Sequence, residues 1–134
     1  YSSYAFSCMK FTVDKKEHYT LLSLDEEHLN SAIAPNLKSE FVVLHNNGVQ
    51  NLIFDMEGIA FVDSSGLSAI LTAHRLWKGQ GSFILTGIIN ETIDKLIKIS
   101  KLDSVFTIIP TVQESIDYIM MEQIERELNA DPED

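Results

Sequence analysis

The chain has 134 residues, of which 20 are Asp or Glu and 10 are Lys or Arg, so its formal net charge is −10. A hydrophobic share of 45% and a charged share of 22% are ordinary for a globular protein, and the length suits one domain. An acidic chain lacks the basic surface that nucleic-acid phosphates or an anionic membrane attract. The composition therefore predicts neither nucleic acid nor a membrane as a partner.

The acidic charge is concentrated near the C-terminus. Residues 111–134 carry eight acidic side chains and one arginine, whereas residues 1–110 carry twelve acidic and nine basic ones. We therefore expect one domain over residues 9–120, nearly balanced in charge, followed by an acidic helical extension over residues 121–134. Residues 1–8 precede Met9 and are expected to be a non-native or disordered leader.

The remaining composition excludes several classes of protein. Cys8 is the single cysteine, which excludes an internal disulfide and a multi-cysteine metal site. The four histidines have no partner at metal-binding spacing, so we predict no metal and no cofactor. No apolar run approaches the roughly 18 residues of a membrane span, and the first residues do not resemble a signal peptide. These features predict a cytoplasmic protein.

The predicted elements begin with an antiparallel hairpin. Alternating apolar residues predict strands over residues 10–16 and 19–24, followed by a polar connection over residues 25–30. The next apolar residues recur every three or four positions and predict a helix from about Ile33 to Leu44. Asn30 or Ser31 is the predicted cap of this helix, and Gly48 its end. Residues 51–55 form a continuous apolar run, which is typical of a strand buried on both faces.

Helices and strands alternate through the rest of the chain. A helix is predicted over residues 64–78, with Trp77 on its apolar face and Gly79 at its end. A strand over 82–86, a short helix starting near Asn90, a strand over 105–109 and a final helix from Thr111 follow. This order predicts an α/β fold: a small mixed β-sheet, with the N-terminal antiparallel hairpin and then parallel strands, and about four helices. These patterns do not determine the order of the strands in the sheet.

The segment from Phe61 to Leu67, of sequence FVDSSGL, lies between a predicted strand and a predicted helix. Ser64 is placed to cap that helix, and Gly66 removes side-chain bulk from its first turn. A helix N-terminus carries unpaired N–H groups and about half a positive charge, so a phosphate on Ser64 would be tolerated. It would add roughly −1.5 to −2 charge to the exposed surface. The alternative is that Ser64 is only a cap, which is the commoner case for a serine before a helix.

The sequence offers little support for an enzyme. It contains neither the phosphate-binding pattern G-x-x-x-x-G-K-[ST] nor the dinucleotide-binding pattern G-x-G-x-x-G. Ser64 does not occur in a G-x-S-x-G nucleophile elbow. A couple between Ser64 and His74 would join groups about 15 Å apart along one helix. These observations favour a binding module over an enzyme.

The same segment resembles the D-S-[ST]-G-L signature of the STAS domain, the module of bacterial anti-sigma factor antagonists and of sulfate-transporter tails. The resemblance extends from about Lys10 to Met120 in the order of the elements. It includes residues 99–106, which resemble the family's third helix turning into its last strand. The resemblance implies a STAS-like fold and a non-enzymatic anti-sigma factor antagonist, in which Ser64 is phosphorylated, with Ser65 as the fallback.

The resemblance also implies a partner-binding surface and a set of partners. The implied surface consists of Asn30, Asp63, Ser64, Ser65, Gly66 and Leu67. Many antagonists have an aspartate where this chain has Asn30, and a neutral amide cannot make the same charged contact. The implied partner is an anti-sigma factor with serine-protein kinase activity, which the chain sequesters to free a sigma factor, and a PP2C-type phosphatase would reverse the modification. A homodimer stays open, as does a non-phosphorylated STAS scaffold subunit of a transport or stress-signalling complex.

Overall fold

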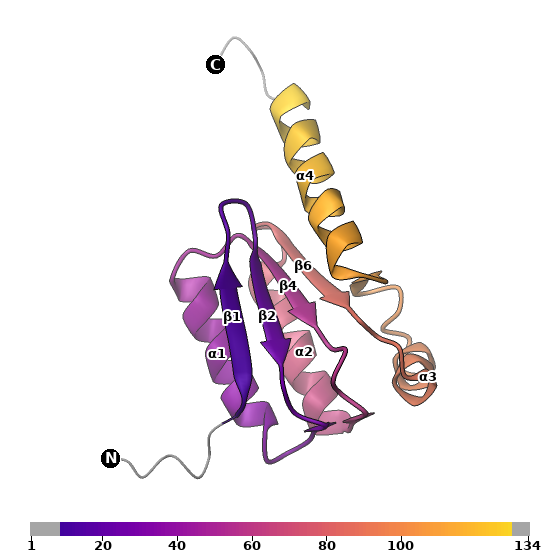
Figure 1. The fold of residues 1–134 in the computed structure, drawn as a ribbon. Helices are drawn as coiled ribbons and strands as arrows, with labels where there is room; N and C mark the ends of the chain where they lie inside the picture. Colours follow the sequence, from indigo (N-terminus) through magenta and orange to yellow (C-terminus); the bar gives the residue numbers. More distant parts are fainter. Residues whose placement is uncertain (1–8, 130–134) are drawn as a thin grey trace, which may run out of the picture.

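The computed structural model describes residues 9–129, so the expectations for residues 1–8, Cys8 included, and for residues 130–134 lie outside the described residues. Figure 1 shows one sheet with helices on both of its faces. The elements in chain order are β1 (Phe11–Lys15), β2 (Thr20–Leu24), β3 (His28–Leu29), α1 (Ala34–Asn46), β4 (Asn51–Asp55), β5 (Phe61–Val62), α2 (Ser64–Trp77), β6 (Ser82–Thr86), α3 (Glu91–Ile99), β7 (Thr107–Ile109) and α4 (Val112–Asn129).

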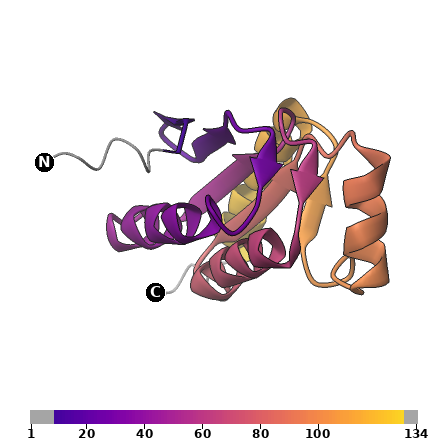
Figure 2. The same cartoon turned by 90° about the horizontal axis from the view of Figure 1, so that it is seen from below.

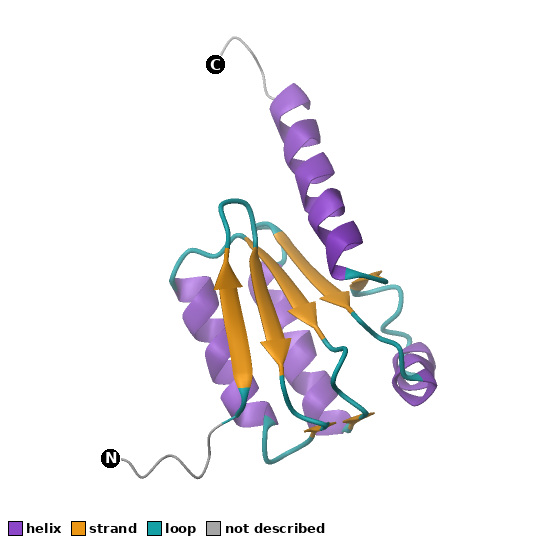
Figure 3. Cartoon of the chain, viewed as in Figure 1, coloured by secondary structure: helices purple, strands orange, loops and turns teal. Residues whose placement is uncertain are grey.

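The main sheet has five strands in the order β1-β2-β4-β6-β7 (Figure 3). β1 and β2 pair antiparallel, and every later pair in this sheet is parallel. Phe54 of β4 lies beside Leu22 of β2 and Leu85 of β6 in this register. The predicted mixed sheet, with an antiparallel hairpin followed by parallel strands, is confirmed.

The helices cover both faces of the sheet, as the view from below shows (Figure 2). α1 and α2 cover one face and α4 the other. Because successive side chains of a strand point to opposite faces, Leu52 and Phe54 join the core under α1 and α2, whereas Ile53 packs with Ile84 and with Ile119 of α4. This arrangement explains why β4 and β6 are apolar without interruption.

Aromatic side chains form the centre of the larger core. The ring of Phe41 meets those of Phe54, Trp77 and Phe83 edge to face, with centroids 5.5–6.4 Å apart. Trp77 is 1% exposed, and its indole N–H donates to the carbonyl of Val49 at 2.9 Å. The predicted core position of Trp77 is confirmed, and the indole donor is satisfied, as a buried polar group requires.

Two short strands were not predicted. β3 and β5 form a separate parallel pair, in which His28 lies beside Phe61 and Leu29 beside Val62. A strand of two residues is too short to show a periodic pattern, so the sequence predicts only a connection over residues 25–30. The last strand, β7, begins two residues later than predicted, because residues 102–106 close turns in which the Val105 and Phe106 N–H groups donate to Leu102.

The start of α1 differs from the prediction, whereas two helix ends agree with it. The residue before α1 is Ile33, which makes no side-chain cap, so the cap predicted at Asn30 or Ser31 is wrong. The side chain of Asn30 instead accepts from the N–H of Ala32 at 3.0 Å and closes a turn ahead of the helix. Gly48 and Gly79, the predicted ends, have positive φ angles of 88° and 82°.

α4 continues without a break through residues 120 and 121, where the boundary of an extension was predicted. Its first half packs on the sheet through Ile116 and Ile119. Beyond them, Ile124 is 48% and Leu128 78% exposed. Among the helices of residues 9–129, none combines the length and the apolar character needed to cross a membrane.

Candidate functional site

The FVDSSGL segment lies at the carboxyl end of the parallel strands. β4 ends at Asp55, the chain turns into β5, and Asp63 follows directly before α2. Because β5 pairs with β3, the residues that follow these two strands are neighbours: the N–H of Asp63 donates to the carbonyl of Leu29 at 3.2 Å. Pairing of β3 with β5 therefore brings Asn30 beside the segment from Asp63 to Leu67.

Asp63, and not Ser64, is the N-cap of α2. Its backbone is extended, and its carboxylate Oδ1 accepts from the N–H of Gly66 at 2.9 Å. The prediction that Ser64 caps this helix is therefore wrong. Two adjacent residues could both act as caps, and the backbone places the earlier one in that role. Ser64 becomes the first residue of α2, and its exposed hydroxyl makes no capping bond.

Gly66 allows α2 to approach β3 closely. A Cβ atom at this position would lie 2.5 Å from the carbonyl oxygen and 2.8 Å from the Cγ of Leu29. No side chain fits within such distances of a backbone atom. The glycine is thus required by the contact between the first turn of α2 and β3, which confirms the expectation that it removes bulk there.

The six residues predicted to bind a partner differ in exposure. Asp63 and Ser64 are exposed, and Asn30 and Ser65 are half-buried. Gly66 and Leu67 are buried. A buried side chain cannot touch a docked protein without rearrangement. Gly66 and Leu67 can therefore contribute only by positioning the exposed residues around them.

Phe61 and His28, which were not among the predicted residues, lie beside Asn30 and Asp63. Phe61 is 58% exposed, and its ring stacks on that of His28, with centroids 5.1 Å apart and planes 13° from parallel. Together with Asn30 and Asp63 they line a shallow cleft of about 310 Å³. Exposed aromatic rings are enriched where proteins meet. A two-residue strand shows no alternation, so the sequence contained no signal that Phe61 faces outward.

A second cleft, of about 380 Å³, lies between the starts of α1 and α2. Four serines and Lys38 supply its polar groups. The full lining is Ser31, Ala34, Pro35, Lys38, Ser64, Ser65 and Ser68. Among these seven residues, Lys38 carries the only ionisable side chain. Lys38 and Ser64 lie in different helices, and only their packing in the fold shows that they share a cleft.

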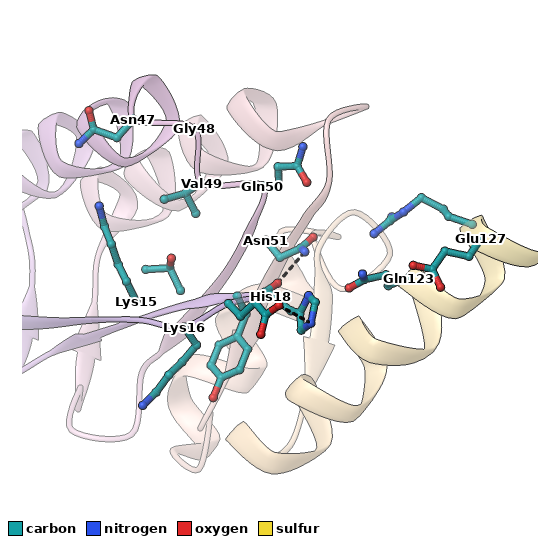
Figure 4. A pocket seen from close by; sticks show the side chains of 14 residues that line it. Lys15, Lys16, His18, Asn47, Gly48, Val49, Gln50, Asn51, Gln123 and Glu127 are labelled. Atoms are coloured by element: carbon teal, nitrogen blue, oxygen red, sulfur yellow. Dashed lines mark hydrogen bonds and ion pairs between the residues drawn. The ribbon is translucent and has the colours of Figure 1, made fainter. Parts of the chain in front are cut away.

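A third and larger cleft, of about 600 Å³, lies at the opposite end of the sheet. Figure 4 shows it between the β1–β2 turn, the connection from α1 to β4, and α4. The side-chain amide of Asn51 links three segments at this cleft: its Nδ2 donates to the His18 carbonyl at 2.9 Å, and its Oδ1 accepts from the Ser82 N–H at 3.2 Å. Lysine, arginine and glutamate side chains are mixed around it, and this mixture defines no single class of ligand. Within residues 9–129, no three His, Cys, Asp or Glu side chains gather as a metal site would require.

The fold and the loop together define a small α/β domain that presents the start of α2 at the carboxyl end of its sheet. The profile of the STAS domain matches residues 10–115. The chain therefore belongs to the STAS domain family, as the FVDSSGL segment led us to expect.

Solved structures support the same fold. An anti-sigma factor antagonist from Mycobacterium paratuberculosis is 16% identical, with a TM-score of 0.76 over 85% of this chain and 96% of that chain. The Bacillus cell fate determinant SpoIIAA in its phosphorylated form is 22% identical, with a TM-score of 0.63 over 82% of this chain and 99% of that one. The murine Solute Carrier 26 family member A9 anion transporter is 15% identical, with a TM-score of 0.65 over 81% of this chain but 18% of that chain. The predicted STAS-like fold is confirmed.

Proposed function

We propose that this protein is a bacterial, cytoplasmic anti-sigma factor antagonist that acts by binding and not by catalysis. In its unmodified form it would sequester an anti-sigma factor through the surface formed by Asn30, Phe61, Asp63 and Ser64. Phosphorylation of Ser64, or of Ser65 as the fallback, by the serine-protein kinase activity of that partner would end the interaction. A PP2C-type phosphatase would restore the binding form.

The observation that carries this proposal is the position of Ser64. It is the first residue of α2, its hydroxyl is exposed, and the neighbouring Asp63 makes the cap in its place. A modification of Ser64 therefore leaves the capping hydrogen bond intact. A phosphate at the first turn of a helix is favoured by the dipole, by about 0.3–1 kcal/mol. The domain can thus carry the phosphate without losing its fold.

The charge at this surface explains why one phosphate would be sufficient. Asp63 is the single ionisable residue between Gly58 and Leu71. A phosphoserine adds about −1.5 to −2 charge at pH 7, which exceeds the single negative charge of Asp63 and the single positive charge of Lys38 in the adjoining cleft. Placing it against an acidic or apolar partner face costs several kcal/mol, on the order of a thousand-fold in affinity. The structural similarity to anti-sigma factor antagonists, of which SpoIIAA is solved in both its unphosphorylated and its phosphorylated form, supports the proposed phosphorylation.

Affinity capture from the source cells tests the proposal. The bait is the full chain, either unmodified or with Ser64→Asp, and the bound proteins and the phosphorylated peptides of the chain are identified by mass spectrometry. We expect the unmodified bait to enrich an anti-sigma factor with a kinase domain, the Ser64→Asp bait to lose it, and Ser64 to be found phosphorylated.

Ser104→Asp is the matched control, since Ser104 is also exposed but lies in the connection between α3 and β7. This control should retain the partner. The proposal fails if Ser64→Asp captures the same proteins as the unmodified bait and neither Ser64 nor Ser65 is ever modified.

A second candidate function is that of a scaffold subunit in a transport or stress-signalling complex, without phosphorylation. It is favoured by the similarity to the anion transporter, of which the matching part is a small share. In this case the same capture would enrich a transporter or a multi-subunit complex, and Ser64→Asp would leave the enrichment unchanged. The genes adjacent to that of this chain provide an independent check, since a kinase-type anti-sigma factor and a sigma factor would favour the antagonist.

A further inference from the structure

The cleft between α1 and α2 places a lysine across from the serines of α2. Ala34 and Lys38 are four residues apart on α1, and Ser64 and Ser68 are four residues apart on α2. Residues with this spacing lie one above the other on a single helix face. The two rows line the same cleft, so Lys38 and Ser64 belong to facing rows.

The ammonium of Lys38 is not engaged by an acidic group. Within residues 9–129 the ion pairs are made by Lys16, His18, His28 and Lys98, and none involves Lys38. Lys38 is half-buried, so its position is more restricted than that of a fully exposed lysine. A cleft that combines an unpaired lysine with neutral hydroxyl groups can bind a small anion, because both kinds of group donate hydrogen bonds.

We propose that the cleft between α1 and α2 is the seat of the phosphate on Ser64, and that Lys38 is the positioning residue that binds it. This inference rests on the proposed phosphorylation of Ser64 and adds where the phosphate goes. Lysine binds phosphate as a point charge, through charge-assisted hydrogen bonds. The hydroxyls of Ser31 and Ser68, which line the same cleft, are further donors to the phosphate oxygens.

This arrangement gives the modification two effects at one surface. The phosphate adds negative charge beside Asp63, and it also neutralises the one cation of the cleft. Before modification, the Lys38 ammonium is free to contact an acidic group of a docked protein. After modification it is paired within the chain, so a partner loses an attractive contact and meets a repulsive one.

The second pKa of the phosphate is the direct measurement. Phosphoserine is inserted at position 64 of the full chain by codon suppression, and the ³¹P chemical shift is followed through a pH titration at low salt. A nearby cation stabilises the dianion and lowers this pKa below its ordinary value of about 6. Because a partly exposed ion pair contributes about 0.2–1 kcal/mol, Lys38→Gln should raise the phosphate pKa by about 0.2–0.7 units.

Two variants separate charge from packing. Lys38→Arg keeps the cation and should restore most of the original pKa. Lys78→Gln removes a cation at the other end of α2, about 21 Å from Ser64, and should leave the pKa unchanged. High salt should reduce the difference between Lys38→Gln and the unmodified lysine, because salt screens exposed charges. If Lys38→Gln titrates as the parent does while remaining folded by circular dichroism, the phosphate does not lie against Lys38 and the inference is wrong.

The titration tests the phosphate site, and the capture experiment tests the antagonist function, so either hypothesis can be wrong while the other holds. The phosphate is inserted without a kinase, so the pKa shift can be found even if Ser64 is never modified in the cell. Conversely, Ser64→Asp could abolish partner capture while Lys38→Gln leaves the phosphate pKa unchanged. That result would support the antagonist function and exclude Lys38 as the residue that binds the phosphate.

Discussion

Replacement of Gly66 by alanine tests whether the contact between α2 and β3 shapes the site. The added Cβ would lie 2.5 Å from the Leu29 carbonyl oxygen and 2.8 Å from its Cγ. Leu29 is fully buried and its strand is paired with β5, so neither atom can move away freely. Overpacking of this kind costs about 1–3 kcal/mol. The better helix propensity of alanine returns up to about 1 kcal/mol.

We therefore expect Gly66→Ala to lower the free energy of unfolding by about 1–2 kcal/mol, measured by urea denaturation followed by circular dichroism. Gly58→Ala is the matched control: its Cβ would meet a single atom at 3.7 Å, an ordinary contact. The control should stay within about 0.5 kcal/mol of the parent. If Gly66→Ala is as stable as Gly58→Ala, the close approach of α2 to β3 is not what requires the glycine.

Three further changes test the cap, a buried hydroxyl and a histidine. Asp63→Ala removes the acceptor of the Gly66 N–H and should lower the free energy of unfolding by about 0.5–2 kcal/mol in the same denaturation assay. Asp63→Asn keeps an acceptor and should recover most of this loss. Equal stability of the parent and both variants would refute the cap. Thr86 is fully buried, and within residues 9–129 its hydroxyl has no hydrogen-bond partner. Thr86→Val should therefore leave the free energy of unfolding unchanged or raise it by up to about 1 kcal/mol. A clear loss of stability would mean that the hydroxyl is hydrogen-bonded. Burial, and then the charges of Lys78 and Arg75, lower the pKa of His74 below its ordinary value of 6.5. The unfolded chain then binds the proton more readily, so the contribution of His74 to stability is present above pH 6.5 and is lost as the pH falls through the lower pKa of the folded state. The urea midpoint should decrease as the pH is lowered through this range, and the decrease should be smaller in His74→Gln. If the midpoint depends on pH equally in both proteins, His74 is not the group responsible.

The elements that the sequence predicted well are those with a long, regular pattern. α2 was expected over residues 64–78 and spans Ser64–Trp77, because its apolar residues repeat over about four turns. The buried strands β4 and β6 were predicted to the residue, since each is an apolar run between turn residues. The short helix predicted to start near Asn90 is α3, and the side chain of Asn90 caps it by accepting from the N–H groups of Thr92 and Ile93.

The parts that could not be predicted depend on contacts between distant segments. β3 and β5 are defined only by pairing with each other, and that pairing brings Asn30 to Asp63. The choice between Asp63 and Ser64 as the cap depends on a backbone angle, to which both residue types are suited. Lys38 reaches the Ser64 cleft only because α1 packs beside α2. The motif therefore indicates the candidate site, whereas the residues that surround it became apparent only from the fold.

The pairing of β3 with β5 also has a consequence for how the protein opens. These four residues lie outside the main sheet, and they adjoin both the turn before α1 and Asp63, the cap of α2. A small unit that is separate from the main ladder can open locally, at a free energy below that of global unfolding. Amide hydrogen exchange should therefore be faster at Asp63, which is bonded to Leu29, than in β4 at the centre of the sheet. Such an opening would release the connection between β5 and α2, directly before Ser64, while the five-stranded sheet stays folded.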